Sequence, residues 1–90
     1  KAPHRSASLQ ALLTAFRQLS REGKEPVSVR TLEIATSFLL LENNLLMTPK
    51  EAHDFLNGLS LIYSDKIFVT PMEDGLYVTG MALKETDLAL

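Results

Sequence analysis

The sequence contains no cysteine and no tryptophan, and its 90 residues carry a net charge of only −2. The absence of cysteine excludes disulfides, thiolate catalysis and cysteine-ligated metal sites. It also suits a reducing compartment, so we expect a cytoplasmic protein. No run of 18 apolar residues occurs, because the longest apolar region, 38–47, is interrupted by Glu42 and two asparagines. No segment is therefore predicted to span a membrane.

Catalytic and cofactor motifs are equally scarce. The chain has two histidines, His4 and His53, no phosphate-binding loop and no nucleophile elbow. We interpret His53 as an ordinary surface histidine, since its neighbours in sequence do not face it on a helix. The adjacent carboxylates Glu73 and Asp74 are typical of a solvated acidic turn. The sequence predicts no enzyme, no cofactor and no metal site.

What the chain does contain is the composition of one folded domain, with 46% hydrophobic and 22% charged residues. We expect residues 1–7 to be a flexible lead-in and residues 8–90 to form a single domain. Because the chain starts at Lys1 without methionine, we expect it to be a piece of a longer protein.

A first helix is predicted from Ser8, which can cap it, to a stop at Gly23. Its apolar residues recur at helical spacing, at Leu9, Leu12, Leu13, Phe16 and Leu19. A very short strand is expected at 27–28.

The second helix is predicted to begin after a Ser28 cap and to end at Asn43-Asn44. Its main apolar stripe comprises Val29, Leu32, Ala35, Phe38 and Leu39. Ile34, Leu40 and Leu41 lie outside that stripe, so the apolar face is wider than one covered side requires. Either both sides of this helix pack inside the domain, or part of the face meets a partner.

The start of the third helix is predicted at Thr48-Pro49-Lys50-Glu51, because this segment provides a cap, a first-turn proline and a capping-box glutamate. Its apolar positions are Ala52, Phe55, Leu56, Leu59, Ile62 and Tyr63. We expect the helix to continue across Gly58; the alternative is an end at Asn57 followed by a strand over 59–63. Two strands, 67–70 and 76–79, should pair around an Asp74-Gly75 turn, with Pro71 at the turn or on an edge. Gly80 should close the second strand, and residues 81–84 and 87–90 suggest a short C-terminal helix.

The order of these elements over residues 8–79, three helices and then a hairpin with Gly75 at its turn, resembles the winged-helix superfamily. The fold class expected from the resemblance is α+β and mainly helical, with a helix-turn-helix core. Members of that superfamily bind DNA, or dock onto proteins within larger regulatory, replication or secretion assemblies. The resemblance therefore implies a binding module.

The surface chemistry favours protein over DNA. We expect a regulatory interaction domain whose partner is another protein or a second copy. The expected contact residues are Ile34, Leu40, Leu41, Leu45, Leu46 and Met47. A charged residue at Leu41 or Leu45 should then abolish binding without unfolding the domain.

The alternative is a DNA-binding domain of a transcription or replication regulator. Its contacts would come from Lys50 and Asn57 on the third helix and from Arg17, Arg21, Lys24 and Arg30. Three features count against this alternative: the negative net charge, Asp54 on the third helix and the acidic turn at 73–74. Neutralising phosphates supplies most of the affinity for DNA, and negative groups oppose it.

Overall fold

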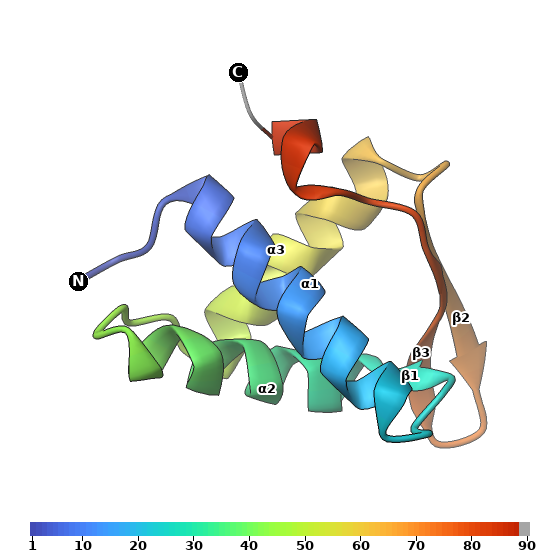
Figure 1. The fold of residues 1–90 in the computed structure, drawn as a ribbon. Helices are drawn as coiled ribbons and strands as arrows, with labels where there is room; N and C mark the ends of the chain where they lie inside the picture. Colours follow the sequence, from blue (N-terminus) through green and yellow to red (C-terminus); the bar gives the residue numbers. More distant parts are fainter. Residues whose placement is uncertain (89–90) are drawn as a thin grey trace.

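The computed structural model describes residues 1–88, and its elements follow the predicted order (Figure 1). Three helices and a short first strand precede a β-hairpin, so the fold is α+β and its arrangement is winged-helix-like. The elements are α1 (Arg5–Arg21), β1 (Val27–Ser28), α2 (Val29–Glu42), α3 (Pro49–Ile62), β2 (Ile67–Met72), β3 (Gly75–Met81) and the 3₁₀ turn η1 (Glu85–Leu88).

The start of α1 differs from the prediction. The helix begins at Arg5, so part of the expected lead-in is helical, and the N-cap is His4. Ser8 does not cap it: its hydroxyl donates a 3.0 Å hydrogen bond to the His4 carbonyl, one turn back, and the side chain is buried. A serine that bonds backwards in this way is compatible with a helix interior, so its capping preference was misleading here.

The end of α1 confirms the role predicted for Gly23. Its φ of 76° is left-handed, a conformation that favours glycine. The amide of Lys24 donates to the Leu19 carbonyl and that of Gly23 to the Ser20 carbonyl, at 3.1 Å each. These two bonds are the Schellman pair that satisfies the last carbonyls of a helix.

The caps of α2 and α3 are also as predicted. The Ser28 hydroxyl accepts from the Thr31 amide at 3.4 Å. At α3 the Thr48 hydroxyl accepts from the Glu51 amide at 3.1 Å, while the Glu51 carboxylate accepts from the Thr48 amide at 2.9 Å. The helix runs through Gly58 to Ile62, which excludes the alternative strand over 59–63.

The three strands form one antiparallel sheet in the order β1-β3-β2. Val78 lies at its centre, opposite Val27 on one side and Val69 on the other. Pro71 lies in β2, which is an edge strand. An edge position suits proline, because it has no amide hydrogen to donate to a neighbouring strand. The strand β3 continues one residue past Gly80 to Met81, so Gly80 does not close it. A side chain at Gly80 would meet the Phe68 ring at 2.9 Å, so the ring, which is 48% exposed, would have to move to accept it.

The core lies between the helices and the inner face of the sheet. Its buried members on α2 include Val29 and Leu32, together with two polar residues, Glu33 and Thr36. Phe38 on α2 and Ile62 on α3, both predicted to be interior, are exposed instead. The inner face of α2 is therefore rotated relative to its apolar stripe.

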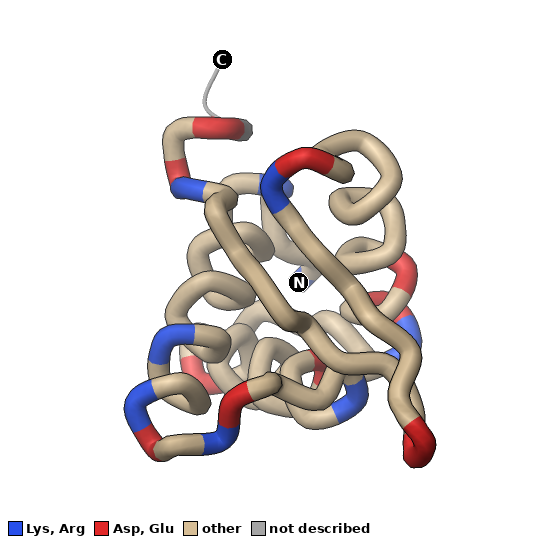
Figure 2. Tube along the Cα trace, turned by 90° about the vertical axis from the view of Figure 1, so that its right-hand side faces the viewer, with Lys and Arg blue, Asp and Glu red and all other residues tan. Residues whose placement is uncertain are grey.

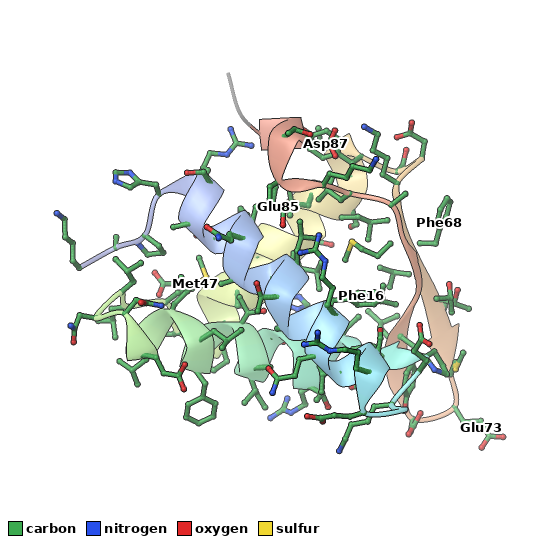
Figure 3. The ribbon with its side chains drawn as sticks, viewed as in Figure 1. Phe16, Met47, Phe68, Glu73, Glu85 and Asp87 are labelled. Carbon is green, nitrogen blue, oxygen red and sulfur yellow. The ribbon has the colours of Figure 1, made fainter. Side chains whose placement is uncertain are left out.

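After β3 the chain turns back across α1. The Arg17 guanidinium on α1 lies 2.9 Å from the Glu85 carboxylate, and the Lys66 ammonium lies 2.7 Å from Asp87 (Figure 3). The Tyr63 hydroxyl donates to the Asp87 carbonyl at 3.0 Å. The short C-terminal helix expected over 81–84 and 87–90 is present only as the 3₁₀ turn η1 over Glu85–Leu88, and residues 82–84 are not helical. Ala89 and Leu90 lie outside the described residues.

Candidate interaction surfaces

The outer side of α2 carries a row of exposed apolar side chains, Ile34, Phe38 and Leu41, which we call the α2 row. Their exposed fractions are 37%, 63% and 53%. Spacings of four and three residues place them on one side of the helix. In Figure 1, α1 and α3 both lie on one side of α2, and the exposure of Phe38 and Leu41 places these two on the other side. Ile34, at the edge of the row, also lines a hollow with Pro49, Lys50 and His53 of α3. Fully burying a large apolar side chain yields roughly 1.5–3 kcal/mol, and the part that corresponds to the exposed fraction of each member is still available for a contact.

The six residues predicted to form a contact surface do not all lie on one exposed surface of the domain. Ile34 and Leu41 belong to the α2 row, and Leu46, at 61% exposure, lies in the loop that follows the helix. Leu45 and Met47 are half-buried in the same loop, where the Met47 carbonyl accepts a hydrogen bond from the Ser37 hydroxyl.

Leu40 is only 2% exposed, so its predicted place on the contact surface is wrong. Leu40 is buried because it shares the inner side of α2 with Leu32 and Thr36. Phe38, which we assigned to the core stripe, is the most exposed member of the α2 row instead.

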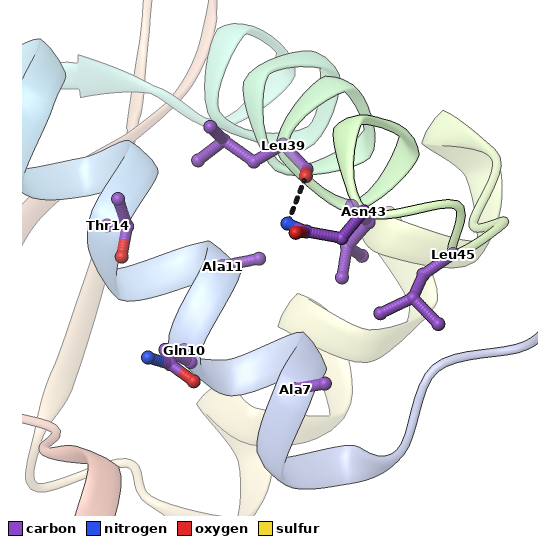
Figure 4. Close-up of a pocket in the computed structure, with 8 residues that line it drawn as sticks. Ala7, Gln10, Ala11, Thr14, Leu39, Asn43 and Leu45 are labelled. Atoms are coloured by element: carbon purple, nitrogen blue, oxygen red, sulfur yellow. Dashed lines mark hydrogen bonds between the residues drawn. The ribbon is translucent and has the colours of Figure 1, made fainter.

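A hollow of about 370 Å³ separates α1 from the end of α2 (Figure 4). Asn43 on its wall donates a 3.3 Å hydrogen bond to the Leu39 carbonyl. The hollow is lined by Ala7, Gln10, Ala11, Thr14, Leu39, Leu40, Asn43 and Leu45. None of these side chains is ionisable, so the hollow offers no side-chain acid or base.

A polar pair links α2 to α3. The Glu33 carboxylate, in a residue only 8% exposed, lies 2.6 Å from Nδ1 of His53. A buried carboxylate needs such a partner, because burial without one is costly. His53 lies at the surface, as predicted, with 51% of its side chain exposed, but it also bonds to Glu33, which the prediction did not include. The signal in the sequence was the position of Glu33, one residue after Leu32 on the inner side of α2.

This pair borders a groove between α2, α3 and the hairpin. Arg30, Glu33 and His53 line two adjoining hollows there, of about 360 and 330 Å³. On the hairpin side, the Tyr77 hydroxyl donates to Asp74 at 2.7 Å, and this hydrogen bond raises the pKa of Tyr77 above its ordinary value. The phenol thus stays protonated at neutral pH and offers no base. Within residues 1–88 no three metal-ligating side chains cluster.

The residues that would contact DNA are mostly offset by acidic neighbours. Lys50 lies 3.5 Å from Asp54 on the exposed face of α3, and Asn57 is exposed on the same helix. The hairpin turn projects away from the helices and carries Glu73 at its tip (Figure 3).

The remaining basic residues also do not form a uniform patch. Arg17 is paired with Glu85. Figure 2 shows basic and acidic positions alternating around the end of α1, where Arg21 and Lys24 alternate with glutamates at 22 and 25. Arg30 lies elsewhere, at the start of α2.

None of the helices in the described part of the chain has the length and apolarity needed to cross a membrane. No protein family, curated protein or solved structure is significantly similar to this chain.

Proposed function

We propose that this domain is a non-catalytic protein-interaction module of winged-helix type within a larger regulatory or assembly protein, and that the α2 row is its docking surface. The observation that carries the proposal is the exposure of Phe38, 63%, at the centre of an apolar row on a well-capped helix. The absence of cysteine suits the reducing cytoplasm, where we place the protein.

The chemistry of the row defines its partner. A straight row of aliphatic and aromatic groups fits the apolar side of an amphipathic helix lying along α2. The row is bounded by charges of opposite sign, with the exposed Arg30 one turn before Ile34 and the exposed Glu42 next to Leu41. The partner helix should therefore carry an acidic group at one end of its apolar side and a basic group at the other.

The other surfaces support this choice by contrast. The face of α3 that a DNA reader would use has its lysine paired with Asp54, and the hairpin turn is acidic. Both would repel or fail to attract phosphates. The hollow between α1 and α2 is lined by side chains without an ionisable group, which makes it a poor catalytic centre.

The test is site-specific photo-crosslinking of the whole chain. A photoreactive phenylalanine is placed at position 38, at position 14 on the exposed side of α1, or at position 61, where Leu61 is 74% exposed. In a lysate of the source cells, position 38 should give a discrete protein adduct that Leu41→Glu abolishes, whereas positions 14 and 61 should not. Equal labelling at 38 and 61, or no adduct at 38, would contradict the proposal.

A salt titration against duplex DNA tests the alternative. The proposal predicts no measurable binding even at low salt. Tight binding that weakens steeply as salt rises would show several phosphate contacts and would replace the proposed function.

A further inference from the structure

We infer that the helix that covers the α2 row is α2 of a second copy of this chain, packed antiparallel about a two-fold axis near Phe38. This inference rests on the proposed function and names its partner. Its basis is that the α2 row and the charges that bound it are complementary to themselves.

The apolar part of the row is nearly symmetric about its centre. Phe38 lies four residues after Ile34 and three before Leu41, all on one side of α2. In an antiparallel pair, Phe38 meets Phe38 of the other copy, and Ile34 of each copy lies beside Leu41 of the other. Such a two-fold contact uses the same patch on both chains and closes on itself, so it stops at a dimer.

The flanking charges select the antiparallel direction. Arg30 and Glu42 are both exposed, at opposite ends of α2, and within the described residues neither forms an ion pair. In an antiparallel pair centred near Phe38, Glu42 of each copy lies beside Ile34 of the other, one helical turn from Arg30, so the long Arg30 side chain reaches along the helix to meet it. A parallel pair would bring like charges together, and it would also align the two helix dipoles unfavourably.

The size of the surface indicates a reversible dimer. Stable complexes bury about 800 Å² per partner, whereas an exposed apolar patch on a monomer covers about 300–600 Å². The α2 row has three members, and Leu46 in the adjoining loop, 61% exposed, adds a fourth. Four side chains are far fewer than the roughly 20–30 residues that each partner contributes to a stable interface. We therefore expect a dissociation constant in the micromolar range, from about 10 to 100 µM.

Sedimentation of the purified chain tests the inference directly. The wild-type protein should change from monomer to dimer as its concentration rises, and no larger species should form. Phe38→Ser should raise the dissociation constant on the order of 100-fold, because both copies lose their central aromatic group. Leu61→Ser is the matched control, since Leu61 is even more exposed, at 74%, but lies on α3, and the change should leave the dissociation constant unaltered. Leu41→Ser should provide a second, independent loss of dimer affinity. Circular dichroism verifies that each variant is folded.

Charge exchange tests the direction of packing. Arg30→Glu or Glu42→Arg alone should weaken the dimer by about tenfold, because each change creates two like-charged contacts. The double variant Arg30→Glu with Glu42→Arg should recover wild-type affinity, because the opposite charges meet again. Failure of the double variant to recover would overturn the antiparallel arrangement.

The other outcomes are equally decisive. A chain that stays monomeric up to about 1 mM overturns the second copy as partner. If such a chain still gives an adduct from position 38 in the lysate, the proposed function survives with a different partner. Association that Leu61→Ser weakens would show a contact through the exposed end of α3, and growth beyond a dimer would show a head-to-tail contact; either result overturns the inference.

Discussion

Helices α1 and α2 differ most on the sides that face water. Each carries an exposed row at spacings of four and three residues: Gln10, Thr14 and Arg17 on α1, and the α2 row on α2. The α1 row is polar, and Arg17 is paired with Glu85. The α2 row is apolar, although it is exposed in the same way. Folding requires no apolar group at these three positions, so their chemistry points to a contact made after folding.

The buried sides of the same two helices also differ in polarity, but here α2 is the more polar helix. The interior of α1 is almost wholly leucine and alanine, whereas α2 buries Glu33 and Thr36. Both polar groups are satisfied, Glu33 by His53 and the Thr36 hydroxyl by the Leu32 carbonyl at 2.7 Å. Helix α2 thus buries two polar residues and exposes three large apolar ones. For this reason the apolar stripe seen in its sequence does not coincide with its buried face.

The largest expected effect contrasts the two sides of α2. Leu32→Ala should lower the free energy of unfolding by about 2–5 kcal/mol, because Leu32 is fully buried and its truncation leaves a cavity. Phe38→Ala should change it by less than about 0.5 kcal/mol under monomeric conditions, because its ring is mostly solvated. Urea unfolding followed by circular dichroism measures both. A large loss for Phe38→Ala would mean that the α2 row belongs to the core.

The next effect contrasts the starts of the two helices. Ser28→Ala should cost about 0.5–1 kcal/mol, toward the lower end of cap losses because its hydrogen bond is long. His4 occupies the corresponding position of α1 but makes no side-chain cap bond, so His4→Ala should cost almost nothing. Equal losses in urea unfolding would show that the difference in capping has no energetic weight.

The smallest effect concerns the charged end of the α1 row. The hydrogen bond from Arg17 lowers the pKa of Glu85 below its ordinary value near 4.5. A lowered folded-state pKa means that the pair stabilises the protein above about pH 4.5, and that this contribution is lost as pH falls through the folded value. The effect should be small, because both groups are exposed.

Glu85→Gln should therefore flatten the loss of stability between pH 6 and pH 3, measured by urea unfolding at each pH. Asp87→Asn is the comparison variant, because Lys66 lowers the pKa of Asp87 in the same direction. The α2 row has no titratable side chain, so Phe38→Ala should leave the wild-type pH profile unchanged. An identical profile in Glu85→Gln would contradict a contribution from the pair.

The order of elements could be predicted from the sequence because local signals mark their ends. Thr48 with Glu51 specified the start of α3, Ser28 that of α2 and Gly23 the end of α1. These signals depend on hydrogen bonds between residues at most a few positions apart. The sheet followed from two short β-rich runs around the turn at Gly75.

The exposed surface could be predicted only in part, because burial depends on partners that are distant in sequence. Ile34 and Leu41 were predicted to lie outside the main apolar stripe of α2, and both are exposed. Phe38 was placed in the main stripe of α2 by its spacing alone, and spacing cannot reveal that Glu33 is buried against His53, 20 residues later. The buried face of α2 therefore includes Glu33 and Leu40, whereas Phe38 lies outside it.

The central claim is that the α2 row, rather than another exposed apolar group, makes the contact between copies. Methyl NMR of the purified chain over a dilution series tests it most directly, with Ile34 and Leu41 as reporters and Leu61 and Ile62, more exposed on α3, as controls. The signals of Ile34 and Leu41 should shift with concentration along one binding curve while those of Leu61 and Ile62 stay constant. Shifts confined to Leu61 and Ile62, or constant signals at all four residues, would contradict it.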